Sequence, residues 1–448
     1  MTKEPEIRDE YVADYEAFSR NGGSGVPQWF EDLRRAAISQ FSATGFPTTR
    51  DERWRFTNVA RLKDTKFALA NGERPTLSLG EVKQHVLGAG ADQCLVFLNG
   101  RYSKELSSIG GIPQGVLAGS LRDVANSGSK RVERHLAKYA KTSDSPFTAL
   151  STAFMSDGAF VYVPQNTIIG EPIQLLFLTA SAGRPVVAHP RNLIVVDRNA
   201  AASVVESHIG LVDGTYWTNA VTEAVVQENA RLHLYRVQRE GGEASHTATT
   251  QSHQRRDSSF ALTTIELGSA LSRHDINAVL AGQGAECSLY GLTQIQGRQH
   301  VDHHTTIEHA RPHCNSWEFF NGIYDDDSRG VFTGRIVVHP GAQQTDSKQT
   351  NNNLLLSKGA RADSQPQLEI YADDVKCTHG ATLGPIDEKA LFYLQTRGIE
   401  AEAARNLLTY GFGVEILNRI EIAELRDQLD QLVHVRLDEG AERRRAGK

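Results

Sequence analysis

Cysteine is scarce in this chain of 448 residues, and its four cysteines lie far apart. They stand at Cys94, Cys287, Cys314 and Cys377, with no CxxC pair and no closely spaced even set. Disulfide-rich secreted domains and zinc modules need such close spacings. The distribution therefore favours a reducing compartment and a fold without a disulfide framework.

Long hydrophobic runs are missing as well. No stretch approaches the roughly 18 consecutive apolar residues that a transmembrane helix needs. The opening segment, MTKEPEIRDEYVADY, is acidic and has neither the apolar core of a signal peptide nor the Arg-rich, acid-poor composition of a transit peptide. We therefore expect a cytoplasmic protein that does not associate with membranes.

The chain has no excess of positive charge. Its 48 Lys and Arg residues stand against 54 Asp and Glu residues, for a formal net charge of -6. Nucleic-acid-binding proteins usually present a basic face, so nucleic acid is not an expected partner. Hydrophobic residues make up 40% of the chain, which is enough to bury a core.

Motifs for independent catalysis are not found. The sequence has no GxxxxGKS/T phosphate loop, and Gly88-Ala89-Gly90 lacks the third glycine and the strand-turn-helix setting of a dinucleotide fingerprint. It also has no GxSxG elbow, no HExxH motif and no convincing pair of acid/base carboxylates. We therefore expect a chain that is not an enzyme on its own and does not hydrolyse nucleotides.

The opening third is patterned mainly as helix. A helix is predicted by apolar residues at steps of four and three, namely Ile7, Tyr11, Tyr15 and Phe18. After a Gly-Ser break at residues 21–25, a second helix behind Pro27 is predicted by Trp29, Leu33, Ala37 and Phe41. The run from Cys94 to Asn99-Gly100 predicts a small hairpin, and a further helix is expected near residues 131–141.

Between residues 156 and 374 the helical pattern almost disappears. Short β-rich runs such as 193–196 and 232–237 recur between polar turns. Small turn-like pairs recur at intervals of 30, 28, 27 and 25 residues, at Asn199-Ala200, Asn229-Ala230, Asp257-Ser258, Gly284-Ala285 and His309-Ala310. The middle of the chain is therefore a degenerate repeat of nearly pure β structure.

Repeats of this length without helices favour a parallel β-solenoid, in which each coil buries its inner face on its neighbours. A β-sandwich is the alternative, but its hairpins would bring turn signals every 8 to 12 residues, and few Asn-Gly or Asp-Gly pairs occur here. The sequence thus predicts a mainly β protein with three parts: an N-terminal mainly helical region at 1–150, a solenoid core at 151–380 and a C-terminal helical region at 381–448.

The C-terminal region regains a helical pattern. Asp387 is a suitable N-cap for a first helix, and Gly398 a suitable C-terminal stop. A second helix carries Leu407 and Leu408 and continues through Phe412 and Ile416. Its surface is more apolar than a lone helix requires, so it either packs on the solenoid or faces a partner.

The densest group of metal-capable side chains, called here the histidine cluster, comprises His300, Asp302, His303, His304, His309, His313 and Cys314. In a strand, His300, Asp302 and His304 would share one face and His303 would point to the other. Three ligands on one face are geometrically feasible. A closed zinc site needs four defined ligands, however, and we therefore favour a structural interpretation over metal binding.

Cys377 and His379 form the second candidate site, at the junction of the solenoid and the C-terminal helices. Thiolate and imidazole are ligands for iron and zinc, and residues two apart in an extended segment share one face. Lys376 would lower the pKa of the thiol only if it pointed toward the sulfur. From spacing alone, a buried structural cysteine beside a turn histidine is the simpler interpretation.

Longer segments identify a family. The run PQLEIYADDVKCTHGATLG at 366–384, followed by DEKALFYLQTRGI at 387–399, closely resembles the SufD branch of the SufB/SufD family of iron–sulfur cluster assembly scaffold proteins. GFPTTRDERWRFTN at 45–58, the histidine cluster and RGVFTG at 329–334 agree with it. The resemblance covers most of the chain.

The resemblance implies a right-handed parallel β-helix and a complex in which SufB and SufD sit on a dimer of the ATPase SufC. ATP hydrolysis would then belong to SufC. It matches His379 to the histidine of SufD-type chains that faces SufB where a nascent cluster forms, so His379 is the preferred iron or cluster ligand and Cys377 a weaker one. It also implies that the C-terminal helices dock SufC, through Leu407, Leu408, Phe412 and Ile416.

One departure bears on the mechanism. SufB-type chains carry a cysteine in a Cys-Asp-Ser segment, and Asn351-Asn352-Asn353 stands there in this chain. The resemblance therefore implies a subunit that does not receive sulfur or build a cluster alone. We expect no tightly bound cofactor in the isolated chain, a transient iron or iron–sulfur cluster in the complex, and homodimers when the chain is alone.

Two other classes of function are compatible with a solenoid. A β-helix carbohydrate-active enzyme would carry paired carboxylates, or Arg and Lys, on one solenoid face together with an export signal, and neither is found. A purely structural solenoid would self-associate by pairing its exposed sheet edges. Retrieval of SufB and SufC with the chain would separate these alternatives from a scaffold subunit.

Overall fold

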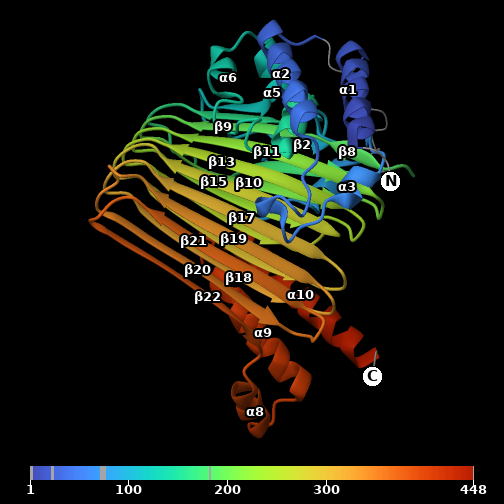
Figure 1. The fold of residues 1–448 in the computed structure, drawn as a ribbon, viewed down its shortest axis with the longest axis vertical. Coiled ribbons are helices and arrows are strands. Elements are labelled where there is room, and N and C mark those ends of the chain that lie inside the picture. The colour runs from blue at the N-terminus through green and yellow to red at the C-terminus, as the bar shows by residue number, and fades with distance from the viewer. Residues whose placement is uncertain (1–3, 22–24, 71–76, 181–182, 447–448) are drawn as a thin grey trace.

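The computed structural model describes residues 4–21, 25–70, 77–180 and 183–446. Its centre is a flattened parallel β-solenoid built from two 11-stranded sheets (Figure 1). From β9 onward each coil adds one odd-numbered strand to the first sheet, called sheet A, and one even-numbered strand to the second, called sheet B. The predicted mainly β solenoid between helical segments is confirmed.

Sheet A runs in the order β21-β19-β17-β15-β13-β11-β9-β6-β5, with β1 and β8 beside this path. From β6 to β21 neighbouring strands pair in parallel, whereas β5 pairs antiparallel to β6. The strands of sheet A are β1 Ala68–Leu69, β5 Leu117–Ser120, β6 Ala159–Val163, β8 Val186–Ala188, β9 Arg191–Val196, β11 Tyr216–Val226, β13 Ser245–Gln254, β15 Leu271–Leu280, β17 His300–His309, β19 Arg329–Val338 and β21 Arg361–Ile370.

Sheet B runs in the order β22-β20-β18-β16-β14-β12-β10-β7-β2-β3, with β4 paired to β2. The predicted hairpin is confirmed as the antiparallel pair β2 and β3, joined at Asn99 and Gly100, which both have positive φ. β2 also pairs in parallel with β7, so sheet B begins inside the N-terminal region. The strands of sheet B are β2 Gln93–Leu98, β3 Arg101–Tyr102, β4 Ser108–Ile109, β7 Ile173–Thr179, β10 Ala201–Gly210, β12 Arg231–Arg239, β14 Ser259–Glu266, β16 Glu286–Ile295, β18 Asn315–Tyr324, β20 Thr345–Leu355 and β22 Val375–Pro385.

The helices gather at the two ends of the solenoid (Figure 1). Those before it are α1 Glu4–Asn21, α2 Gln28–Thr44, α3 Ala60–Asp64, α4 Leu79–Lys83, α5 Leu121–Asn126, α6 Lys130–His135 and α7 Pro146–Ala153, with a 3-10 turn at Glu52–Trp54. Those after it are α8 Glu388–Thr396, α9 Ala401–Leu417 and α10 Ala423–Ala446.

A stacked corner turn repeats along the solenoid. One residue with positive φ occupies this corner in successive coils: Asn166, Asn199, Asn229, Asp257, Gly284, His313 and Gln344. Its backbone N–H donates to a carbonyl of the next coil, as from Asn199 to Glu228 O at 3.0 Å. Asn, Asp and Gly tolerate this conformation better than other residues, which explains the repeated pairs in the sequence.

The predicted turn pairs at 199, 229, 257 and 284 are confirmed as this corner. The fifth pair, His309-Ala310, is wrong, because His309 is the last residue of β17 and the corner falls at His313. The interval of 25 residues to His309 was too short, since the corner after Gly284 comes only at His313, beyond the end of β17.

The N-terminal helices close the first end of the solenoid. The predicted face of α1 packs into an aromatic cluster with α2 and α7, and Ile7, Tyr15 and Phe18 are buried in it. The predicted second helix is confirmed as α2, with Pro27 as its N-cap. Residues 22–24 of the predicted Gly-Ser break lie outside the described residues.

The helix expected at residues 131–141 is shorter than predicted. α6 ends at His135, and the chain then wraps around the buried carboxylate of Glu223. This carboxylate accepts backbone N–H groups from Ala137 at 2.7 Å, Tyr139 at 2.8 Å and Ala140 at 3.0 Å. A charged acceptor from a distant strand has replaced the hydrogen bonds of a helix.

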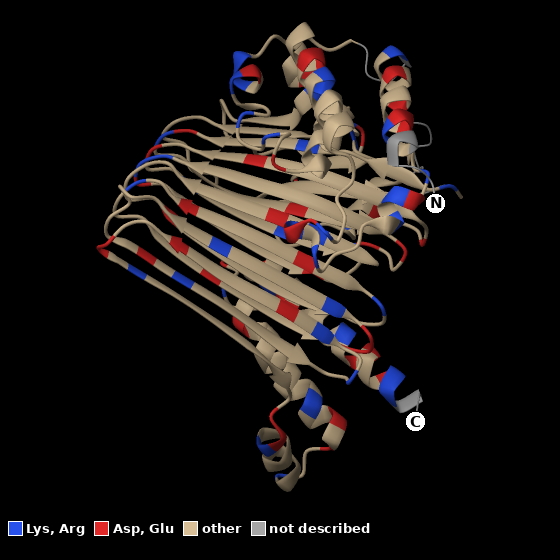
Figure 2. Cartoon of the chain, viewed as in Figure 1, with Lys and Arg blue, Asp and Glu red and all other residues tan. Residues whose placement is uncertain are grey.

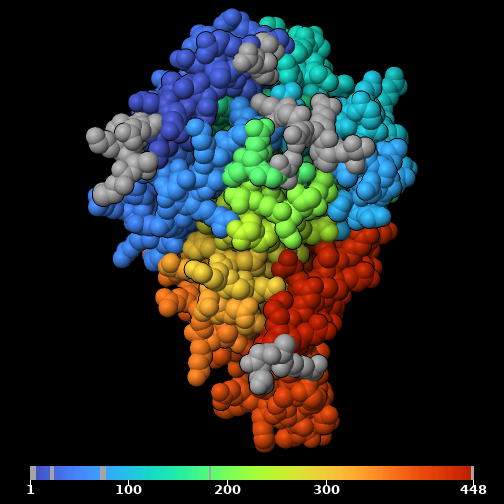
Figure 3. Space-filling model, turned by 90° about the vertical axis from the view of Figure 1, so that its right-hand side faces the viewer, coloured from blue at the N-terminus to red at the C-terminus, as the bar shows by residue number. Residues whose placement is uncertain are grey.

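The C-terminal helices follow the predicted signals. Asp387 caps α8 by accepting the N–H of Lys389 at 2.8 Å, and Gly398 has a φ of +87° just beyond its end. α9 and α10 cover the outer face of sheet B, and α10 reaches back to the region of residues 85–90 (Figure 3). α8 has no buried residues and projects beyond the solenoid (Figure 1).

Charge is mixed over the visible face of the molecule. Basic and acidic positions alternate along the strands and helices, and no large region of one sign is visible from this side (Figure 2). Among the residues that the structure describes, no helix is both long and apolar enough to cross a bilayer.

Candidate functional site

Strands β21 and β22 form the last coil, and within the described residues no further strand pairs with either of them. Cys377 and His379 lie on β22, two residues apart, in register with Ser347 and Gln349 of β20. Those two β20 side chains are buried inside the solenoid, so Cys377 and His379 point along the same interior column. Because no coil follows, Cys377 is only half-buried and His379 is exposed.

Cys377 is not an activated thiol. Burial, followed by the charge of Asp346, raises the pKa of Cys377. Lys376 is adjacent in the strand and therefore points to the opposite face, so it does not offset these effects. The imidazole of His379 is thus the more accessible ligand group of the pair.

One column of interior residues changes from apolar to polar toward this end. In register through sheet B its first members are apolar, as in Leu234, Leu262 and Leu289, and its last three are Glu318, Gln349 and His379. Gln349 Nε2 donates to Glu318 Oε2 at 2.5 Å. The lumen behind His379 is therefore polar for two coils.

Glu318 is fully buried in this column. Burial raises the pKa of Glu318 to about 7, and hydrogen bonds from Gln349 and Thr305 oppose that rise. The site residues predicted from the sequence did not include Glu318 or Gln349. Only the strand register, which the sequence does not show, places them behind His379.

The end face is also apolar at its rim. Ile370, Tyr371 and Leu383 are 40%, 62% and 55% exposed on and beside the two end strands. Unpaired strand edges with apolar neighbours are surfaces that accept a further strand from another chain. The end face thus combines a strand-pairing surface with an imidazole and a thiol.

The histidine cluster does not form one site. As predicted, Asp302 and His304 lie on the outer face of β17, and His303 points into the lumen. His309 is bonded to Ser316 Oγ at 2.9 Å, and His313 occupies the corner turn. The cluster is therefore divided among the outer face, the lumen and a turn.

The outer members of the cluster hold the N-terminal segment in place. Thr57 Oγ1 donates to Asp302 Oδ2 at 2.5 Å and lies 2.9 Å from His300 Nε2. Arg273 donates to Asp302 at 2.6 Å and to the Arg53 carbonyl at 2.8 Å. Asp302 is thus the centre of a buried anchor rather than a free metal ligand.

Arg273 completes this anchor. Its guanidinium lies 4.1 Å from the ring centroid of Trp54 and bonds to Asp275 at 2.9 Å. The charge of Arg273 keeps the pKa of Asp302 far below its usual range despite burial, which alone would raise it. The structure therefore supports the structural interpretation of these outer side chains.

The lumen holds a polar network that the sequence analysis missed. Arg236 Nη1 donates to Glu266 Oε1 at 2.5 Å, and Arg236 Nη2 donates to His246 Nε2. Nearby, His208 Nε2 lies 2.8 Å from Glu206 Oε1. These residues stand at the alternate positions of their strands that face the lumen. This alternation could be recognised in the sequence only if the inward and outward faces were already known.

The predicted partner surface on α9 is only partly exposed. Leu407 is 50% exposed and lines a groove of about 480 Å³ between α9 and α10. Leu408 and Phe412 are half-buried. Ile416 is fully buried against sheet B, so its assignment to a partner surface is corrected. Of the apolar run on α9, Ile416 packs in the core and Leu407 is exposed.

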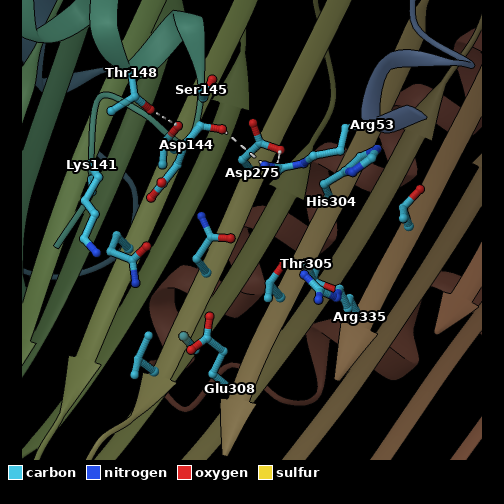
Figure 4. A pocket seen from close by; sticks show the side chains of 18 of the residues that line it. Arg53, Lys141, Asp144, Ser145, Thr148, Asp275, His304, Thr305, Glu308 and Arg335 are labelled. Atoms are coloured by element: carbon cyan, nitrogen blue, oxygen red, sulfur yellow. Dashed lines mark hydrogen bonds and ion pairs between the residues drawn. The ribbon is translucent and has the colours of Figure 1, made fainter. Parts of the chain in front are cut away.

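A groove of about 670 Å³ lies on the outer face of sheet A beside the N-terminal segment (Figure 4). Two of its acidic residues pair with arginine: Asp275 with Arg53 at 3.4 Å, and Glu369 with Arg335 through two bonds of 2.6 and 2.7 Å. A glycosidase needs one carboxyl with a raised pKa beside an ionised one. These paired side chains do not supply that arrangement.

Two family models match the chain. The SufBD protein N-terminal region matches residues 5–175, and the SufBD core domain of SUF system FeS cluster assembly matches residues 177–412. A SufBD family iron–sulfur cluster assembly protein of Synechocystis sp. is 34% identical over 90% of this chain and 90% of its own length. Iron–sulfur cluster assembly protein SufD of Escherichia coli is 30% identical over 94% of this chain and 99% of its own, and that of Bacillus subtilis is 28% identical over 91% and 94%.

Proposed function

Because the chain belongs to the SufBD family of iron–sulfur cluster assembly proteins, we propose that it is a SufD-type scaffold subunit of a SufBCD-type complex. The observation that carries the proposal is the open end of the solenoid. There, β21 and β22 each have one edge that no strand of the described residues pairs with, and β22 carries Cys377 and His379.

A SufB-type chain is the partner proposed for this end. Strand addition to β21 and β22 would continue both sheets and cover Ile370 and Leu383. It would bring ligands of the second chain opposite His379, which offers an imidazole at the open end of the interior column. Iron or a nascent cluster is then shared cargo, with thiolate and carboxylate from the partner and at most a secondary contribution from Cys377.

SufC is the partner proposed for the C-terminal helices. The groove between α9 and α10 is lined by Leu407, Tyr410, His434 and Leu437, and Tyr410 and His434 stack at 4.1 Å between centroids. ATP hydrolysis belongs to SufC in this scheme, since the chain has no phosphate loop. The subunit is therefore non-catalytic and acts in the cytoplasm, where SUF-type assembly would occur.

The test is co-expression of the chain with SufB and SufC, anaerobic purification through a tag on this chain, and quantitation of iron and sulfide. His379→Ala is compared with wild type and with His339→Ala. His339 is a matched control because it is half-exposed, follows β19 near the same end, and has only a 3.7 Å contact to Glu308.

We expect SufB and SufC to copurify with all three chains, and iron and sulfide to fall several-fold only in His379→Ala. Equal iron in His379→Ala and wild type would remove His379 from the cluster site. Failure to retrieve SufB or SufC with wild type would refute the scaffold role itself. Leu407→Glu, which alters an exposed side chain, should lose SufC and retain SufB.

A further inference from the structure

Glu266, His274 and His303 meet inside the solenoid lumen. β15 and β17 are neighbours in sheet A and pair His274 with His303, and Glu266 ends β14 in the facing sheet. All three side chains are buried. One ligand atom of each residue lies within 4.8 Å of the ligand atoms of the other two.

Two imidazole nitrogens of this group have no partner. His274 uses Nε2 with Thr250 Oγ1 at 2.8 Å, whereas its buried Nδ1 has no hydrogen-bond partner. Nε2 of His303 also has none. Burying a polar atom without a partner is unfavourable, and two such atoms in one group indicate a missing ligand.

The carboxylate of Glu266 has capacity for that ligand. Its Oε1 accepts Arg236 Nη1 at 2.5 Å, and its Oε2 accepts Ser272 Oγ at 3.1 Å. Each carboxylate oxygen has about two lone pairs, so Oε2 keeps one that is not used by Ser272. Two imidazole nitrogens and one carboxylate oxygen are therefore available together.

The side chains around this group include more carboxylates than cations. Arg236 Nη2 bonds to Nε2 of His246, whose Nδ1 lies 2.6 Å from Glu240 Oε2. Burial lowers the pKa of His208, which favours the neutral form of that imidazole. Among the described residues of this network, Arg236 is the single arginine or lysine beside three carboxylates, Glu206, Glu240 and Glu266.

We propose that Glu266, His274 and His303 bind a divalent first-row transition metal ion inside the solenoid. Two neutral imidazoles and one carboxylate are a donor set suited to Zn²⁺ or Fe²⁺, and a fourth position is left for water. Metal–nitrogen bonds of about 2.1 Å bring ligand atoms to about 3.4 Å from one another, so ligand atoms now separated by more than this distance move closer on binding.

The ion joins sheet A to sheet B through the lumen and cancels the excess negative charge. It is separate from the open end, because β17 is followed by β19 and then β21 in sheet A before the solenoid stops. The site therefore does not depend on SufB, SufC or any cluster cargo. Since the ligands are enclosed, the ion enters while the chain folds.

The experiment uses the full chain expressed alone in medium supplemented with Co²⁺, dialysed against EDTA and assayed by plasma mass spectrometry. His274→Asn, His303→Asn and Glu266→Gln remove one ligand each. His309→Asn is the matched control, because His309 is also a buried lumen histidine with one bonded nitrogen, to Ser316 at 2.9 Å, but belongs to no such group of three ligand residues within the described part of the chain. His379→Ala controls for metal at the open end.

Wild type, His309→Asn and His379→Ala should retain about one Co²⁺ per chain, and the ligand variants at least fivefold less. Soluble wild type should also show the visible absorption bands of Co²⁺ bound by nitrogen and oxygen ligands. This spectrum tests the proposed site even if the variants do not fold. Wild type free of metal and of these bands, or ligand variants that retain as much metal as wild type, would overturn the proposal.

Discussion

Glu318 is a carboxyl group that the fold buries without a cation beside it. Its hydrogen-bond donors are neutral, the amide of Gln349 and the hydroxyl of Thr305, and burial raises its pKa to about 7. The folded chain therefore binds this proton more tightly than the unfolded chain. The protonated form therefore adds to the free energy of unfolding. This contribution is fully present below pH 4.5, the ordinary pKa of a glutamate, and is lost as the pH rises through 7.

Glu318→Gln should remove this pH dependence. Glutamine keeps an acceptor oxygen for Gln349 and has no proton to lose, so the variant should be more stable than wild type by roughly 1 to 3 kcal/mol at pH 8 and similar at pH 5. Urea unfolding at both pH values measures it. Glu286→Gln, at an exposed position, is the control, and parallel pH profiles of Glu318→Gln and wild type would contradict the expectation.

Asp302 anchors the N-terminal segment through Arg273 and Thr57. Asp302→Asn leaves the guanidinium of Arg273 buried with one fewer carboxylate, so we expect a loss of roughly 3 kcal/mol in the free energy of unfolding. Tryptic cleavage at Arg50 to Arg55 should quicken in parallel.

Asp363→Asn is the matched comparison for Asp302→Asn. The Asp363 pair with Arg329 spans 2.7 Å, but the two side chains are 30% and 37% exposed, so its loss should cost at most about 1 kcal/mol. Equal losses in the two variants would show that burial of the Asp302 group does not set its contribution.

At the scale of elements, the two end strands make the molecule asymmetric. The first end of the solenoid is closed by helices, whereas no strand of the described ranges pairs with the outer edges of β21 and β22, and α8 projects past them (Figure 1). Identical chains can meet through the same surface that we propose for SufB. Self-association of the isolated chain should therefore depend on the apolar rim of these strands.

Ile370→Lys combined with Leu383→Lys should weaken self-association at least about tenfold, since charges on an edge disfavour strand pairing. Sedimentation velocity over a concentration series measures the dissociation constant. Ile168→Lys is the control, because Ile168 is 75% exposed but lies on an early coil. If Ile168→Lys weakens the dimer equally, the interface is not at the end strands.

At the scale of the whole molecule, α9 and α10 are part of the core rather than an appendage. They cover apolar residues on the outer face of sheet B, which include Val205, Val237, Ile265, Leu292 and Ile323. A solenoid that ended at β22 would expose this surface over several coils. Large exposed apolar surfaces promote aggregation.

A chain truncated after Pro385 should therefore bind the dye ANS strongly and aggregate at concentrations where the full chain does not. Dye fluorescence and light scattering measure both effects. Placing Thr at Ile265 and Ile323 in the truncated chain should reduce them in proportion to the apolar area removed. A truncated chain that stays monodisperse with no increase in dye binding would show that the helices are dispensable for the core.

Much of the fold could be predicted from local patterns in the sequence. The helical steps of α1, α2 and α9, the Asn99-Gly100 hairpin and the caps at Asp387 and Gly398 depend on residues within a few positions of one another. The alternation that separates His303 from Asp302 is equally local. The fifth corner and the end of α6 were mispredicted, since the stacking of coils and a distant carboxylate decide them.

The sequence by itself determined that this chain is a β-solenoid between helices and that Cys377 and His379 share one face of a strand. Only the tertiary structure decided what surrounds them: Gln349 and Glu318 behind His379, Ile416 against sheet B, and Glu266 beside His274 and His303. The physical reason is that coils stack residues about 30 positions apart, so lumen neighbours depend on strand register and coil length, which no local pattern specifies.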